Sequence, residues 1–147
     1  MQLGSQHPLY DFGICTMADV RRPYALYIRI EDLAGFLELV APALEERLAR
    51  SDHAGRSGPL DLDFYRTGLR LQFEDGRLRA VEPWQPTTED YGHFAFRELS
   101  FLQLLMGFRS LRDLQHAHPD CLERSRAHLS WIEALFPTAP SHCVPAS

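Results

Sequence analysis

The sequence predicts an α+β domain: a sheet of about five strands, antiparallel or mixed, covered by helices on one face. Two observations carry the α+β prediction. Apolar and polar residues alternate in several short runs in the middle of the chain, which is the period of half-buried strands. Apolar residues recur every three or four positions on either side of these runs, which is typical of amphipathic helices. Strands and helices are therefore segregated along the chain.

The first expected elements are a strand and a helix. Residues 24–30, YALYIRI, are rich in aromatic and β-branched side chains, which favours a strand. Asp32 is placed to cap the helix that follows. The apolar positions of that helix recur at spacings of three and four: Leu33, Leu37, Val40, Leu44 and Leu48. Pro42 falls within this pattern and lacks an N–H, so we expect a kink or a division into two helices.

A loop at residues 51–59 is expected to lead into an antiparallel meander. The runs LDLDFY, LRLQF and RLRAVEP each place apolar side chains on one face. Between the second and third runs, Asp75 and Gly76 both tolerate a positive φ, which is typical of a tight hairpin. The run HFAF, residues 93–96, is expected to add a short fourth strand to this meander.

The remainder of the chain is expected to form helices. One covers residues 99–108, and a second begins at Ser110 with Asp113 in the capping-box position. A third covers residues 122–136, and the proline-rich tail beyond it is expected to be extended. Residues 1–22 are interpreted as a linker or the tail of a missing preceding domain, and residues 23–147 as the domain itself.

Composition narrows the classes of function. The net charge of −5 argues against a nucleic-acid-binding protein, and no apolar run is long enough to predict a membrane span. All 15 basic residues are arginine, so neither a Schiff-base lysine nor a phosphate-loop lysine is available. Three cysteines far apart, Cys15, Cys121 and Cys143, predict reduced thiols in a cytoplasmic protein.

Motifs for catalysis or metal binding are weak. His116 and His118 point to different sides of a helix, so with Cys121 they do not predict a metal site. Asp61 and Asp63 share one face of a strand. We expect that face to be solvated, and Arg70 on the next strand to pair with one carboxylate for at most about 1 kcal/mol.

The strongest apolar pattern in the sequence is LSFLQLLMGFRSLRDL, residues 99–114. Its Leu and Phe side chains form a helical stripe. Its first interpretation is ordinary core. The alternative is one wall of a hydrophobic tunnel between helices and sheet. By strand and helix facing, such a pocket would be lined by Leu62, Phe64, Leu71, Phe73, Phe101, Leu105, Phe108 and Trp131.

Several segments resemble a known family. GPLDLDFYRTGLRLQFEDGRLRAVEPW, LSFLQLLMGFRSLRDL, PDC and ALFPTAPSHCVP resemble the carboxy-terminal region of bacterial GNAT-superfamily N-acetyltransferases, over residues 24–145. That region is similar to a sterol carrier protein-type domain. The resemblance implies a curved sheet and a hydrophobic cavity that takes fatty acyl chains or sterols.

The resemblance also implies a role. The core that binds acetyl-CoA in such enzymes is not in this chain, so we expect a non-catalytic accessory domain without a cofactor of its own. Its implied partners are a GNAT catalytic domain, in cis or in trans, and a hydrophobic small molecule. Two alternatives stay open: a structural module with a filled core that forms homo-oligomers, or a domain that lends the terminal carboxylate of Ser147 to an acetyltransferase active site as catalytic base.

Overall fold

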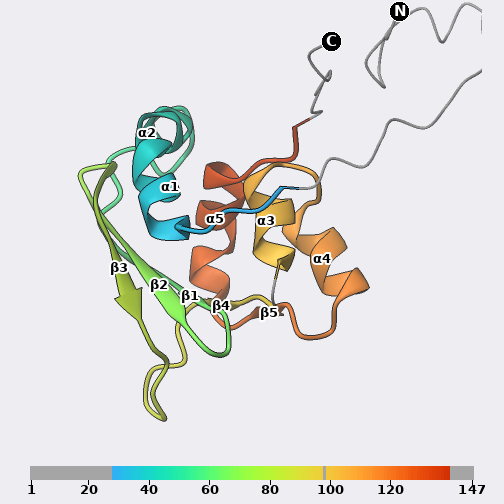
Figure 1. The fold of residues 1–147 in the computed structure, drawn as a ribbon. Coiled ribbons are helices and arrows are strands. Elements are labelled where there is room, and N and C mark those ends of the chain that lie inside the picture. The colour runs from blue at the N-terminus through green and yellow to red at the C-terminus, as the bar shows by residue number, and fades with distance from the viewer. Residues whose placement is uncertain (1–27, 98, 140–147) are drawn as a thin grey trace, which may run out of the picture.

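The structure is a computed structural model that describes residues 28–97 and 99–139. It confirms the α+β class: an open mixed sheet of five strands, in the order β3-β2-β1-β4-β5, lies against helices that sit on one side of it (Figure 1). The expected linker, residues 1–22, lies outside the described residues, and so does most of the strand expected at residues 24–30. The described end of that segment, residues 28–30, is not a strand.

Two short helices replace the single helix that the N-terminal pattern suggests. α1 (Leu33–Leu39) begins where Asp32 Oδ1 accepts a hydrogen bond from Gly35 N at 2.9 Å. α2 (Ala41–Ala49) follows at once and carries Pro42 in its first turn. A proline is tolerated there because the first N–H groups of a helix have no partner within it. The predicted division at Pro42 is therefore confirmed.

The three-stranded meander is also confirmed. β1 (Gly58–Asp63) pairs antiparallel with β2 (Gly68–Glu74), which pairs antiparallel with β3 (Arg77–Trp84). Asp75 and Gly76 make the second turn with φ of 49° and 76°. The edge strand β3 is closed off in part by α2, because Leu78 N donates to Glu45 Oε1 at 3.0 Å.

The fourth strand does not extend the meander as expected. β4 (Phe94–Ala95) runs parallel to β1 on the opposite side from β2, and β5 (Leu122–Glu123) pairs antiparallel with β4. The chain between β3 and β4 must therefore cross β2 and β1. It crosses them on the polar face, where Asp90 comes within 3.4 Å of Arg70. We call residues 85–93 the crossing segment.

The C-terminal helices are shorter than predicted. α3 (Ser100–Leu105) ends before Gly107, whose φ of 67° turns the chain, and α4 (Leu111–Ala117) starts with the expected capping box of Ser110 and Asp113. The helix predicted over residues 122–136 is wrong in its first half. That half forms β5 and a 3₁₀ turn, η3 (Arg126–His128), because β4 offers it an edge to pair with; α5 (Leu129–Leu135) follows.

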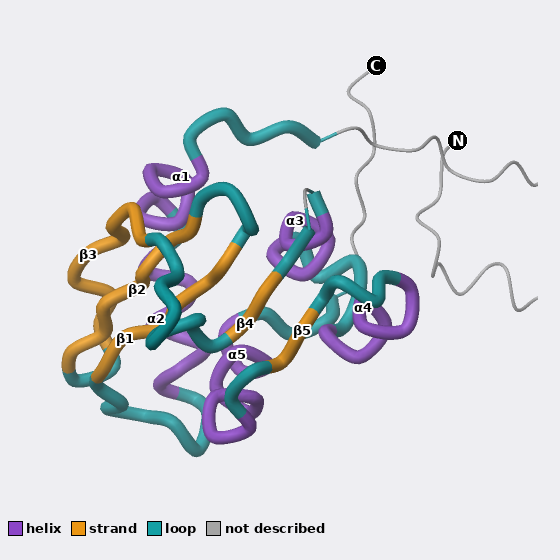
Figure 2. The backbone as a smooth tube through the Cα atoms, turned by 90° about the horizontal axis from the view of Figure 1, so that it is seen from below, coloured by secondary structure: helices purple, strands orange, loops and turns teal. Residues whose placement is uncertain are grey.

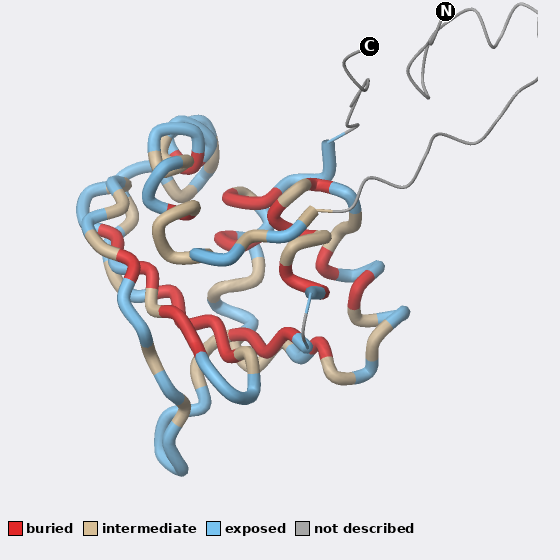
Figure 3. The backbone as a smooth tube through the Cα atoms, viewed as in Figure 1, coloured by how far each residue is buried: buried red, intermediate tan, exposed pale blue. Residues whose placement is uncertain are grey.

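The buried residues lie along the central strands and on the helices beside them (Figure 3), and their side chains form one hydrophobic core. The largest wholly buried ones are aromatic: Trp131, Phe73, Phe94, Phe96, Phe101 and Phe136. Figure 2 shows the strands side by side from below, with β4 and β5 at the end of the sheet away from β3. Buried residues also continue onto the polar face of β1, which the alternating pattern does not predict.

Candidate functional site

Most side chains predicted to line a pocket lie in the core and touch one another. The buried members are Leu62, Leu71, Phe73, Phe101, Leu105 and Trp131, and Phe64 packs against them partly buried. The ring centroids of Phe73 and Trp131 are 5.3 Å apart, and those of Phe64 and Phe101 are 5.5 Å apart. These are the distances of aromatic rings in direct contact.

Phe108 is the exception among the predicted pocket residues. Its exposed fraction is 68%, because α3 has ended and Gly107 has turned the chain toward solvent. Two surface hollows lie away from it: one is bordered by Gln115, Arg126 and residues 121–124, and another by α2 and the β2–β3 turn. Ser147, the other residue singled out by the sequence, lies outside the described residues.

The most unusual group in the structure is on the polar face of β1. Asp61 and Asp63 were expected in solvent, and that expectation is wrong: their exposed fractions are 2% and 3%. The crossing segment covers Asp61, and the segment after β5 covers Asp63. A carboxylate this deeply buried needs partners for its charge and its lone pairs.

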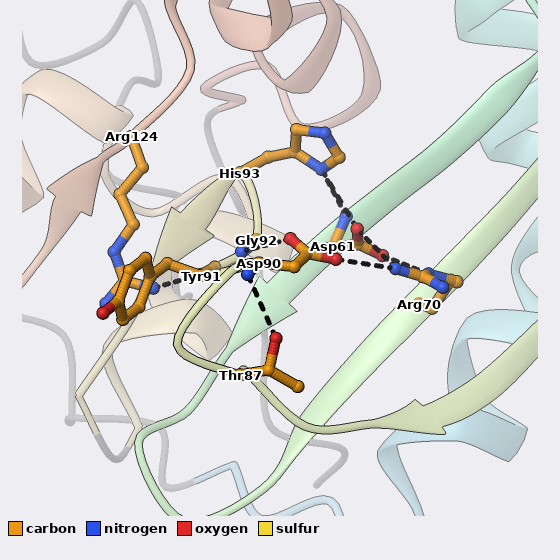
Figure 4. Close-up of polar contacts among 8 residues, drawn as sticks. All are labelled: Asp61, Arg70, Thr87, Asp90, Tyr91, Gly92, His93 and Arg124. Atoms are coloured by element: carbon orange, nitrogen blue, oxygen red, sulfur yellow. Dashed lines mark hydrogen bonds and ion pairs between the residues drawn. The ribbon is translucent and has the colours of Figure 1, made fainter.

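Asp61 is paired with Arg70, as the sequence suggested, but the pair is mostly buried. Arg70 Nε donates to Asp61 Oδ1 at 2.6 Å and Arg70 Nη2 donates to Oδ2 at 3.0 Å, a two-pronged contact across neighbouring strands (Figure 4). Such paired, charge-assisted bonds are among the strongest that side chains make. The hydrogen bond to Asp61 is the largest cause of a raised pKa of Arg70.

Asp63 is paired with an arginine from much later in the chain. Its Oδ2 accepts from Arg124 Nη1 at 2.8 Å, and its Oδ1 accepts from Tyr65 N at 2.6 Å. Arg124 also donates to the Tyr91 carbonyl of the crossing segment. No sequence signal identifies this partner, because it is reached only once β5 has paired with β4.

The crossing segment is itself held in a fixed shape. Asp90 N donates to Thr87 Oγ1 at 3.0 Å and Gly92 N donates to Asp90 Oδ1 at 3.0 Å (Figure 4). Gly92 has a φ of 72°, and a Cβ there would lie 2.6 Å from the Trp84 ring. Only glycine satisfies both conditions.

Two histidines extend this polar group toward α5. Asp61 N donates to Nδ1 of His93 at 2.9 Å, so the neutral ring carries its proton on Nε2. The His93 ring lies against the His128 ring, with centroids 3.8 Å apart. Burial lowers the pKa of His93, with Asp61 and Asp90 opposing the shift. Burial, and then the charges of His93 and Arg56, lower the pKa of His128 to about 4.

The pKa of His128 predicts a pH dependence of stability. Neutral His128 is favoured in the folded chain, whereas the unfolded chain takes up a proton below about pH 6.5. The stabilisation of the folded chain by neutral His128 is complete above that pH and is lost as pH falls toward 4. Because His128 is partly exposed, we expect the free energy of unfolding to fall by only about 1 kcal/mol between pH 7 and pH 5. Urea unfolding of the wild type and H128Q at both values measures it.

The control for this measurement is H116Q, since His116 is exposed on α4. H116Q should keep the wild-type difference between the two pH values, and H128Q should reduce it. If the difference survives unchanged in H128Q, neutral His128 does not stabilise the fold.

The hydrogen bonds of Asp61 and Asp63 indicate what the polar face of β1 does. Both oxygens of each buried carboxylate accept hydrogen bonds from fixed donors, and each carboxylate is held as the charged partner of an arginine. The pairs tie three distant segments together: β2, the crossing segment and the residues after β5. We therefore interpret the two carboxylates as structural, and the adjacent histidines and Arg56 as the accessible polar surface.

Comparison of the chain with protein-family models, with curated proteins and with solved structures gives no significant match. Within residues 28–97 and 99–139, each helix is too short to cross a lipid bilayer.

Proposed function

We propose that this chain is an accessory domain of a GNAT-type N-acetyltransferase, and that it acts by binding the catalytic domain rather than by enclosing a lipid. The motifs named above supply the family, and the five-stranded mixed sheet with helices on one side is compatible with it. One observation carries the choice between the two modes of action: the rings expected to line a tunnel are packed against one another.

Phe101 lies at the centre of the stripe that raised the question of a tunnel, and other rings surround it closely. Its ring centroid is 5.5 Å from that of Phe64, 5.2 Å from that of Phe96 and 5.5 Å from that of Phe136. A fatty acyl chain could enter only by separating these rings, and their separation costs dispersion energy.

Apolar side chains on the surface offer a place for a partner. Leu99 immediately precedes α3 with 53% of its surface exposed, and Phe108 follows α3 with 68% exposed. Phenylalanine is enriched at protein–protein interfaces relative to the rest of the surface. We therefore place the docking surface around α3.

Without its partner, the isolated chain is expected to associate with itself through this surface. Light scattering at rising concentration should give a mass above the 16.9 kDa of one chain. F108S should shift the mass toward the monomer, and L39S, a matched change at the exposed end of α1, should leave it unchanged.

Native mass spectrometry of the same samples tests the competing mode of action. The proposal expects a protein mass without a co-purified acyl chain or sterol. A bound lipid that mild extraction removes would show that the chain carries a ligand and does not act by binding a partner. A wild type that stays monomeric, or equal effects of F108S and L39S, would exclude the docking surface around α3.

A further inference from the structure

We propose that Arg56, His53 and His128, gathered beside the Trp131 ring, form a binding site for a phosphate group. We call these three side chains the cationic cluster. They come from the loop before β1 and from η3, segments far apart in the sequence. The inference does not rest on the proposed function, because a phosphate site is compatible with either an accessory or a carrier role.

Arg56 is one of several arginines without a carboxylate partner among the described residues. Arg70 and Arg124 are each paired with a buried carboxylate. Arg56 has no carboxylate within 4 Å in the described part of the chain. Its guanidinium lies 4.4 Å from the centre of the Trp131 ring and makes only long contacts, 3.4 Å to His53 Nδ1 and 3.5 Å to the Ala127 carbonyl. Arginine presents five N–H donors, so several remain for a ligand.

The two histidines are held in place by serine hydroxyls. His53 Nε2 lies 2.9 Å from Ser130 Oγ, and His128 Nδ1 lies 2.7 Å from Ser125 Oγ. These contacts hold both rings without an acidic side chain: His53 lies against the Arg56 guanidinium, and the centroid of the His128 ring is 5.6 Å from that of Trp131. The buried Trp131 Nε1 has no hydrogen-bond partner among the described residues.

The charges facing the cluster favour an anion. Burial is the main cause of the lowered pKa of both His93 and His128, and the positive charge of Arg56 lowers it further. The acids on the other side of His93 are Asp61 and Asp90, and Arg70 contacts both of them. A cation at the cluster would be repelled by Arg56, whereas an anion would be attracted and would stabilise protonated imidazoles.

A phosphate group fits better than a carboxylate. A phosphate offers acceptor oxygens in a tetrahedral arrangement, so it can accept from arginine and imidazole donors that come from different directions. A carboxylate has two oxygens in one plane and would leave part of the cluster unpaired. Since His128 is neutral at pH 7, phosphate binding should be coupled to proton uptake and should tighten as pH falls toward 5.

The experiment uses the full chain and inorganic phosphate, glycerol phosphate and acetate as probes. Proton NMR of the histidine rings follows binding, and Trp131 fluorescence follows it independently. We expect phosphate to raise the pKa of His128 toward its ordinary value. R56Q should weaken phosphate binding at least tenfold, and R50Q, which removes an exposed arginine from the end of α2, should not.

H128N supplies a second variant if R56Q fails to fold, and it should reduce the tightening of phosphate binding that the wild type shows as pH falls. Tighter binding of glycerol phosphate would identify a phosphorylated molecule, and tighter binding of inorganic phosphate would identify the free ion; both support the site. Acetate binding as tight as phosphate, equal affinity in the wild type and R56Q, or no histidine shift with any probe would overturn it.

Discussion

Asp61→Ala is expected to lower the free energy of unfolding by about 3 kcal/mol. The substitution removes a carboxylate that is 2% exposed and leaves Arg70 with only a 3.4 Å contact to Asp90. Breaking one side of a buried ion pair costs more than the pair itself contributes, because the remaining charge loses its partner away from water. Arg70 keeps about a third of its side chain in solvent, which holds the loss below the upper end of the usual range.

Urea unfolding measures this loss, and Glu74→Ala is its matched control. Glu74 lies on β2 and contacts Arg79 at 2.8 Å, but both side chains are exposed, so its loss should stay below about 1 kcal/mol. The double variant D61A/R70A should recover part of the stability, because the unpaired charge has gone. Equal losses in D61A and E74A would contradict the structural role of the buried pair.

Local sequence patterns predicted the elements whose causes are local. The hairpin at Asp75 and Gly76, the cap at Asp32 and the capping box at Ser110 each depend on residues within three or four positions. The division at Pro42 has an equally local cause, the missing N–H. Such features are present in the folded chain because they are compatible with its tertiary contacts.

The features that the sequence did not predict depend on distant segments. The alternation in LDLDFY correctly puts Leu60 and Leu62 on one face, but it cannot show that the crossing segment covers the other. Asp63 is buried because Arg124, 61 positions later, reaches it. The same pairing explains the error at residues 122–136, where a strand next to β4 outcompetes a helix.

The candidate site was missed for a related reason. His53, Arg56 and His128 carry no common motif and belong to segments that η3 and α5 bring together only in the folded chain. Composition gives no signal for this site, because the fifteen arginines are outnumbered by twenty acidic residues. Which of the arginines remains unpaired is decided by the topology of the sheet.

Phe101→Ala is expected to cost about 3–5 kcal/mol of the free energy of unfolding, and it decides between core and tunnel at the same time. In a filled core the substitution removes a ring that touches Phe64, Phe96 and Phe136, and it leaves a cavity that these rings cannot close. If the ring instead lines a tunnel, it has ligand space on one side and its removal changes stability little. Thermal or urea unfolding measures the difference.

Phe108→Ala is the control for this substitution, because it makes the same chemical change at a side chain that is 68% exposed. It should change stability by no more than about 0.5 kcal/mol. The cavity in F101A should also gain affinity for a small apolar probe such as benzene, which the wild type should lack. Benzene binding by the wild type, together with a loss of less than about 1 kcal/mol in F101A, would show that the stripe is the wall of a site after all.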